Sequence, residues 1–259
     1  MLMGKFSGVL ICSDFDGTLA SKAEIPEINI EKIKYFCAGG GRFSIITGRG
    51  SDFFIKYIGV FNFETYMGCT NGTVICHFPS GEVVLCDYLR DDLFGRVITL
   101  CDKIDKIKSV ELYPDGEPIN FSGDAEQIKK SLEDVRGINI HKILIRTAIE
   151  ATDDDVALAR AHMGEECAVS RSWKFGIEFQ NGNFHKGIAA HNIAKLLGAE
   201  KLITVGDFEN DIPLLMAGDE SYATQNALDS VKAVANHVLT RTSAEGAIAE
   251  LIDILDKRI

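Results

Sequence analysis

The chain has 259 residues, of which 46% are hydrophobic and 25% charged, a composition that suits a globular protein of one or two domains. A net charge of −11 argues against a nucleic-acid-binding protein, whose surface carries a basic patch. The seven cysteines include no Cys-x-x-Cys pair, which indicates core residues in a reducing compartment rather than a zinc site or a disulfide framework.

Neither a signal peptide nor a membrane span is expected from the sequence. The apolar run Val9–Cys12 is short and leads directly into acidic residues, unlike a cleavable signal. No apolar stretch has the length of a membrane-spanning helix. We therefore expect a soluble cytoplasmic protein.

The first 80 residues alternate between buried strands and helices. Apolar runs predict strands over Val9–Cys12, Phe43–Ile46 and Thr65–Cys69, with helices over Ile30–Ala38 and Ser51–Ile58 between them. Each strand runs into a polar turn that contains glycine. This rhythm is typical of a parallel α/β sheet, whose ligands bind at the carboxyl ends of the strands.

From about Ser80 the pattern changes to helices mixed with hairpin-like strands. The predicted strands are Glu82–Cys86, Val110–Tyr113, Ile140–Arg146, Ala168–Ser172 and Phe175–Phe179. The predicted helices are Asp91–Ile104, Asp124–Val135 and Asp153–Gly164. Such a mixture indicates a separate α+β domain.

The alternating pattern then resumes toward the end of the chain. Its predicted helices and strands are Lys186–Leu197, Leu202–Val205, Glu209–Ala217, Tyr222–Thr224, a helix from Ala227, Val238–Leu239 and Ala244–Leu255. We therefore predict an α/β fold: a doubly wound, Rossmann-like parallel sheet over residues 1–80 and 184–259, with an α+β cap domain inserted over residues 81–183.

Two aspartates follow the first strand, one residue apart. Positions i and i+2 of a strand point the same way, so Asp14 and Asp16 could converge on one spot. Paired carboxylates repel each other unless a cation or a reaction uses them. The alternative is an ordinary solvated Asp-x-Asp-Gly turn. Residues elsewhere in the chain have to distinguish a functional pair of aspartates from such a turn.

Other strand ends carry matching polar groups. The second strand ends in Thr47-Gly48, the fourth in Gly206-Asp207, followed by Asn210-Asp211, and Lys186 begins a helix. Several carboxylates suit a hard cation such as Mg²⁺. A threonine hydroxyl, a glycine amide and a lysine ammonium suit the oxygens of a phosphoryl group, so the set points to phosphoryl transfer.

These residues resemble the four motifs of the haloacid dehalogenase-like (HAD) phosphatases. The matching segments, in order, are Asp14-Phe15-Asp16-Gly17-Thr18-Leu19, Ile45-Ile46-Thr47-Gly48-Arg49, Lys186-Gly187 and Gly206-Asp207-Phe208-Glu209-Asn210-Asp211. The insert between the second and third motifs is similar to the type II cap of the Cof-like branch. Asn71-Gly72 before it, and Ala223 with Asn226-Ala227 after the fourth motif, are similar to that branch as well.

The resemblance implies a role for each motif residue. Asp14 is the nucleophile that forms an aspartyl-phosphate, and Asp16 is the general acid and base. Mg²⁺ is held by the carboxylates of Asp14 and Asp207 and by the backbone carbonyl of Asp16, with Asp211 nearby. The phosphoryl oxygens are held by Thr47, Gly48 and Lys186, supported by Asn210.

Each assignment has a simpler alternative. Lys186 could be a solvated lysine, and Asn210 and Asp211 could cap the helix that follows them. We expect Thr18 to serve the turn after the aspartates rather than the chemistry. Arg49 is expected to pair with a carboxylate on a helix face.

The function expected from the sequence is a Mg²⁺-dependent phosphatase for small phosphorylated metabolites, with sugar phosphates as candidates. A phosphomutase of the same superfamily and a non-catalytic sensor of phosphorylated ligands are the alternatives. We expect a monomer or homodimer without nucleic-acid or membrane partners. Substrate selection is expected in the inserted domain, where Trp173, Lys174 and Asp115 are candidate contacts whose simpler reading is ordinary turn residues.

Overall fold

The computed structural model describes residues 4–57, 59–61, 63–104 and 106–258. The chain divides into two compact units. The first unit combines the residues up to Val84 with those from Lys186 onward, and the second is Leu85–His185. Each unit has a hydrophobic core of its own.

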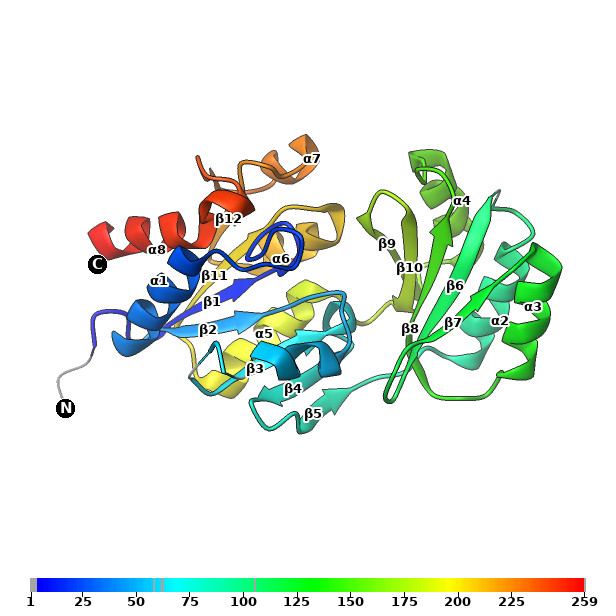
Figure 1. Cartoon of the computed structure of the whole chain (residues 1–259), viewed down its shortest axis with the longest axis horizontal. Helices are drawn as coiled ribbons and strands as arrows, with labels where there is room; N and C mark the ends of the chain where they lie inside the picture. The colour runs from blue at the N-terminus through cyan, green and yellow to red at the C-terminus, as the bar shows by residue number, and fades with distance from the viewer. Residues whose placement is uncertain (1–3, 58, 62, 105, 259) are drawn as a thin grey trace. The chain divides into compact units, whose positions relative to one another are not determined.

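The first unit is built on a five-stranded sheet with the order β13-β12-β11-β1-β2 (Figure 1). Its strands are β1 (Val9–Ser13), β2 (Arg42–Ile45), β11 (Lys201–Gly206), β12 (Glu220–Ala223) and β13 (His237–Val238). All four pairings are parallel. Strand β1 is buried along its whole length, as its continuous apolar sequence predicts. The chain adds β2 on one side of β1 and β11 on the other, which confirms the doubly wound α/β fold.

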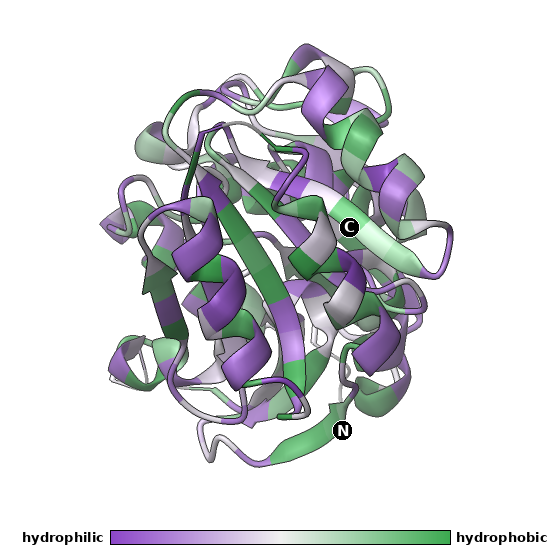
Figure 2. Ribbon diagram, turned by 90° about the vertical axis from the view of Figure 1, so that its right-hand side faces the viewer, coloured by the Kyte–Doolittle hydropathy of each residue, from purple (hydrophilic) through white to green (hydrophobic). Residues whose placement is uncertain are grey.

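Four of the five helices described in the first unit pack in pairs beside this sheet. The five are α1 (Glu27–Ala38), α5 (Lys186–Leu197), α6 (Ile212–Ala217), α7 (Asp229–Lys232) and α8 (Ala247–Arg258). Helix α1 packs against α8, and α5 packs against α6. Figure 2 shows both purple and green residues along the helices of the molecule, as expected of helices that bury one face and expose the other. Short 3₁₀ helices lie at η1 (Ser51–Tyr57), η2 (Thr70–Gly72), η3 (Glu209–Asp211) and η4 (Ser243–Glu245).

A second, smaller sheet follows β2, with the order β3-β4-β5. Its strands are β3 (Thr65–Cys69), β4 (Val74–Phe78) and β5 (Val83–Cys86). Strand β3 pairs with β4 in antiparallel fashion and reaches the end of β2 through one parallel bridge, between Ile46 and Gly68. The prediction that β3 belongs to the parallel sheet is thus met at one bridge only, and the main partner of β3 is β4, to which the tight turn after Cys69 connects it.

The second unit is an α+β arrangement. Its five-stranded sheet has the order β7-β6-β8-β10-β9, and every pairing is antiparallel. The strands are β6 (Ile107–Pro114), β7 (Ile119–Ser122), β8 (Ile140–Thr147), β9 (Cys167–Trp173) and β10 (Gly176–Asn181). Helices α2 (Asp91–Leu100), α3 (Ala125–Asp134) and α4 (Asp153–Met163) contribute to the same apolar core as the alternate residues of these strands.

Several local predictions differ from the structure. The segment expected as a helix over Ser51–Ile58 is a 3₁₀ helix over Ser51–Tyr57, and Ile58 lies outside the described residues. The helix expected over Glu209–Ala217 is divided into η3 and α6. Strands β4 and β7 were not predicted, since their short sequences lack a clear alternation. Within the described residues, none of the helices is long and apolar enough to cross a membrane.

Candidate active site

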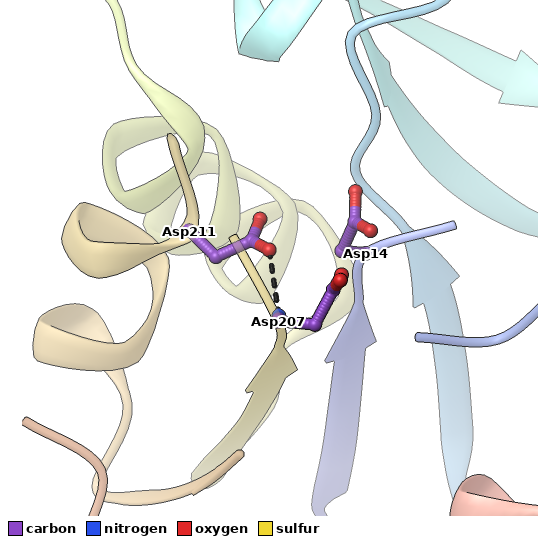
Figure 3. Close-up of side chains that lie close together, drawn as sticks. All are labelled: Asp14, Asp207 and Asp211. Atoms are coloured by element: carbon purple, nitrogen blue, oxygen red, sulfur yellow. Dashed lines mark hydrogen bonds between the residues drawn. The ribbon is translucent and has the colours of Figure 1, made fainter. Parts of the chain in front are cut away.

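Three aspartates gather at the carboxyl ends of β1 and β11 (Figure 3). Asp14 follows β1 and Asp207 follows β11, and the register pairs Ser13 with Val205, so the two aspartates leave neighbouring strands within one residue of the same level. Asp211, on η3, completes the group. One oxygen from each carboxylate lies within 4.8 Å of the others, and all three residues are buried. This is the sheet edge at which a doubly wound fold binds its ligands.

Backbone amides hold Asp211 in place. Its Oδ2 accepts hydrogen bonds from the amides of Asp207, at 2.9 Å, and Phe208, at 3.1 Å. Figure 3 shows the first of these as the dashed line. The bend that brings Asp211 back over β11 leaves no room at Gly206, where a Cβ atom would lie 2.4 Å from the Cβ of Asp211. Asp211 also precedes α6, but its side chain makes no cap to that helix. Its carboxylate is therefore held by the turn between β11 and η3 and not by α6.

Lys186 supplies positive charge to the three aspartates. It is the first residue of α5, and its Nζ lies 2.6 Å from Oδ1 of Asp14 and 2.6 Å from Oδ1 of Asp211. Its exposed fraction is 1%, which rules out a solvated lysine. Burial alone would lower the pKa of Lys186, but Asp14 and Asp211 raise it above the ordinary value. The ammonium group is therefore charged at neutral pH.

One ammonium group does not balance three carboxylates. Burial, followed by repulsion from Asp211, raises the pKa of Asp14 well above its ordinary value, and Lys186 offsets only part of this. Burial and Asp211 likewise raise the pKa of Asp207 to about 7. Buried carboxylate oxygens that lack positive charge are the donor set that a hard divalent cation prefers. The residues present therefore fit a Mg²⁺ ion.

Asp16 lies outside this buried group. The strand ends at Ser13, so the i, i+2 rule no longer applies, and the Asp16 side chain is 46% exposed. Arg49 donates to both of its oxygens, from Nε at 2.6 Å and from Nη2 at 2.7 Å. The Arg49 guanidinium also lies 4.1 Å from the ring centre of Phe53. Our expectation of a helix-face partner for Arg49 was wrong, because Asp16 is in the loop after β1.

Thr47 lies at the end of β2, beside the turn after β3. Its amide donates to the carbonyl of Gly68 at 2.9 Å, and its carbonyl accepts from the amide of Asn71 at 2.8 Å. The Thr47 side chain is buried, and its Oγ1 accepts a hydrogen bond from the amide of Arg49 at 3.3 Å. Gly48 is therefore carried on a short loop whose ends are both fixed.

Thr18 contacts Asp207, a partner that the sequence analysis did not assign to it. Its Oγ1 donates to Oδ1 of Asp207 at 2.9 Å, and the side chain is fully buried. The turn between Asp16 and Thr18 requires glycine: Gly17 has a φ of +87°, and a Cβ there would lie 2.3 Å from Oδ2 of Asp207. Asn226 supports the same turn by donating to the Gly17 carbonyl at 2.8 Å.

Asn210 connects two parts of the site. It lies on η3, is buried, and its Nδ2 donates to Oδ1 of Asn71 at 3.2 Å. Sequence reasoning gave Asn71 no role, although an asparagine followed by glycine directly after a strand is a visible signal of a special turn.

The candidate contacts in the second unit have partners within that unit. The Asp115 carboxylate accepts a hydrogen bond from the Tyr88 hydroxyl and lies 2.9 Å from Nε2 of His141. Lys174 forms an ion pair with Glu150 at 3.5 Å. The Trp173 ring lies 5.3 Å from the guanidinium of Arg146. The role of Trp173, Lys174 and Asp115 in substrate selection stays a prediction.

Comparison with known proteins identifies the family. A family model described as haloacid dehalogenase-like hydrolase matches residues 11–252. Phosphoglycolate phosphatase 2 of Saccharolobus solfataricus is 26% identical, over 96% of this chain and 91% of its own length. A phosphoglycolate phosphatase of Sulfurisphaera tokodaii is also 26% identical, over 95% of this chain and 94% of its own length.

Solved structures share the fold over nearly the whole chain. A HAD subclass IIB sugar phosphatase has a TM-score of 0.80 at 18% identity, covering 96% of this chain and 99% of its own. A HAD/COF-like hydrolase from Plasmodium vivax has a TM-score of 0.78 at 22% identity, covering 99% of this chain and 97% of its own. The chain belongs to the haloacid dehalogenase-like hydrolases and is an enzyme of that family.

Proposed function

We propose that the protein is a Mg²⁺-dependent phosphatase that hydrolyses small phosphorylated metabolites through an aspartyl-phosphate on Asp14. The observation that carries this proposal is the buried group of Asp14, Asp207 and Asp211 around Lys186, at the carboxyl ends of β1 and β11. Relatives named phosphoglycolate phosphatase and a structural neighbour described as a sugar phosphatase support the substrate class.

The first step is attack by Asp14. An Oδ of Asp14 forms a bond to phosphorus as the bond between phosphorus and the leaving oxygen breaks. Lys186 orients the attacking carboxylate through its 2.6 Å contact with Oδ1. The Thr47 hydroxyl, the Gly48 amide and the Lys186 ammonium are assigned to the phosphoryl oxygens, where charge spreads in the transition state, and Asn210 supports them.

Asp16 is assigned the proton transfers. It gives a proton to the leaving oxygen, then takes one from the water that attacks the aspartyl-phosphate, which releases phosphate and restores Asp14. In the structure Arg49 binds both oxygens of Asp16. Asp16 must therefore exchange Arg49 for the substrate oxygen in each turnover.

Asp14, Asp207 and the Asp16 carbonyl are assigned to hold Mg²⁺, with Asp211 beside them. The ion, when bound, supplies positive charge that lets the Asp14 carboxylate and the substrate phosphate approach each other. The raised pKa of Asp14 and of Asp207 supports this assignment, because both carboxylates need more positive charge than Lys186 provides.

The experiment that tests the function is a phosphate-release screen. Purified protein is incubated with phosphoglycolate, sugar phosphates and other small phosphate monoesters, with and without Mg²⁺, and Asp14→Asn serves as the blank. We expect Mg²⁺-dependent release that Asp14→Asn abolishes. Absence of release from every compound, or full turnover by Asp14→Asn, would overturn the proposal. An isomerised sugar phosphate in place of free phosphate would identify a phosphomutase instead.

A further inference from the structure

The turn after β3 has a backbone conformation that side chains rarely adopt. Thr70, Asn71 and Gly72 have φ values of 48°, 57° and 95°, and all three residues are buried. A left-handed backbone at two consecutive residues other than glycine costs free energy, and residues of this kind cluster at functional sites. The surroundings of the turn must hold it in this conformation.

Backbone hydrogen bonds attach the turn to the loop after β2. The amide of Thr70 donates to the carbonyl of Arg49 at 2.8 Å, and the amide of Asn71 donates to the carbonyl of Thr47 at 2.8 Å. The left-handed conformation directs these two successive amides toward one loop. Both ends of the Thr47–Arg49 segment are thereby fixed, including the Gly48 peptide that is assigned to the phosphoryl group.

The Asn71 side chain reaches the other half of the site. Its Oδ1 accepts the hydrogen bond from Nδ2 of Asn210, across 139 residues of sequence. This bond fixes the plane of the Asn210 carboxamide. Asparagine meets both requirements of the position, since it tolerates a left-handed backbone and its side chain offers an acceptor to the Asn210 amide.

We propose that Asn71 is a positioning residue of the phosphoryl site. Its backbone holds the Thr47–Arg49 loop, and its carboxamide orients Asn210, so that groups from two distant segments meet the same phosphoryl group. The inference rests on the proposed phosphatase function and adds to it a residue outside the four motifs. If Asn71 acts on phosphoryl binding, its replacement changes the affinity of the enzyme for substrate and phosphate. If Asn71 acts on folding alone, its replacement gives less folded protein, and each folded molecule keeps the wild-type affinity.

Asn71→Gly separates the side chain from the backbone, because glycine adopts the left-handed conformation freely. The probes are p-nitrophenyl phosphate as substrate and inorganic phosphate as a product inhibitor. We expect KM for the substrate and Ki for phosphate to rise together, by about tenfold, which corresponds to the loss of one oriented hydrogen-bonding group. Tm is expected to stay within a few degrees of the wild type. If the wild-type enzyme is active and Asn71→Gly has the same KM and Ki as the wild type, the inference is overturned.

A double-mutant cycle with Asn210→Ala tests whether Asn71 acts through Asn210. We expect the double variant to lose no more kcat/KM than Asn210→Ala alone, whereas losses that multiply would overturn the coupling. Asn71→Ala should match Asn71→Gly in KM and show a lower Tm, because alanine is strained at a φ of 57°. Wild-type KM in Asn71→Gly together with a raised KM in Asn71→Ala would assign the effect to the backbone alone and overturn the side-chain role.

Asn236 provides the matched control. Its Oδ1 accepts hydrogen bonds from the amide and Oγ of Ser221, at 2.8 and 3.0 Å, beside β12. Asn236→Gly should lower Tm and leave KM and Ki unchanged; an equal rise in KM there would show that any lost asparagine contact produces the effect and would overturn the inference. A wild-type enzyme inactive on every phosphate monoester would contradict the proposed function instead, so the two failures are distinguishable.

Discussion

The single ammonium group of Lys186 contacts both Asp14 and Asp211. One positive charge is therefore shared between two carboxylates of the site. Each contact is 2.6 Å long and fully buried. Asp207 lies beside this pair, and burial and Asp211 raise its pKa to about 7, an effect that Lys186 offsets only in part. A site with this balance attracts a cation next to Asp207 while Lys186 keeps the nucleophile oriented.

Replacing Lys186 should affect activity and stability together. In Lys186→Met we expect kcat/KM to fall about 1,000-fold, because a charged donor to the phosphoryl oxygens is lost. The free energy of unfolding without Mg²⁺ should fall by about 3 kcal/mol, since the buried carboxylates lose their partner. Steady-state kinetics and urea unfolding measure the two effects. Lys195→Met, an exposed position on the same helix, is the control, and a Lys186→Met enzyme with more than about a tenth of the wild-type kcat/KM would contradict the assignment.

Thr18 belongs to the metal site through Asp207. Thr18→Val keeps the side-chain shape and removes the donor to Oδ1 of Asp207. We expect the Mg²⁺ concentration for half-maximal activity to rise about tenfold, as is usual when a partner of a metal ligand is removed. A titration of phosphate release against Mg²⁺ measures this. Thr99→Val, an exposed threonine of α2, should leave the curve unchanged, and an unchanged curve in Thr18→Val would separate Thr18 from the metal site.

At the scale of elements, the junction between β11 and η3 is packed too closely for any side chain at Gly206. In Gly206→Ala the new Cβ would meet the Cβ of Asp211 at 2.4 Å and displace the carboxylate from the amides of Asp207 and Phe208. We expect a loss of about 2 kcal/mol in unfolding free energy and a higher Mg²⁺ concentration for half-maximal activity. Denaturant unfolding and a Mg²⁺ titration measure both. Gly59→Ala, where no heavy atom of the described residues lies within 4 Å of the added Cβ, should change neither.

The helices and strands that the sequence predicts best are those whose apolar pattern and end signals lie within or directly beside the element. Helix α5 has the predicted bounds, Lys186–Leu197, because its apolar spacing and the following Gly198 mark both ends. Strand β1 stands out as a continuous apolar run buried on both faces. The antiparallel pairing of β3 with β4 was not predicted, since it depends on a turn in which Thr70 and Asn71 adopt left-handed φ values that the composition does not indicate.

The same difference between local patterns and long-range contacts holds for the candidate active site. Residues at strand ends, such as Asp14 and Asp207, could be predicted because parallel strands end at one edge. The contacts of Thr18 with Asp207 and of Asn71 with Asn210 join positions 189 and 139 residues apart. Such contacts depend on the fold as a whole. The pair of Arg49 with Asp16 was missed for the same reason, because it joins loops after two different strands.

At the scale of the whole molecule, one charged group connects the far side of the sheet to the last helix. Glu220 of β12 accepts hydrogen bonds from Tyr222, Lys201 of β11 and Arg258 of α8. His237 of β13 lies 3.1 Å from the same carboxylate. Burial raises the pKa of Glu220, but the hydrogen bonds from Tyr222, Lys201 and Arg258 outweigh it and lower the pKa from 4.5 to about 2.

This pKa predicts how acid destabilises the first unit. A carboxyl group whose folded-state pKa lies below its unfolded-state pKa stabilises the fold at pH values above about 4.5, and the contribution is lost as the pH falls toward 2. Glu220→Gln should therefore lower the unfolding free energy by about 2 kcal/mol at pH 7. The difference from the wild type should shrink as the pH falls from 5 to 3, because the wild-type carboxylate then takes up a proton on unfolding. Urea unfolding at pH 7, 5, 4 and 3 measures the effect, with Glu31→Gln on the exposed face of α1 as the control. A difference that stays constant over this range would show that Glu220 contributes through packing rather than through its charge.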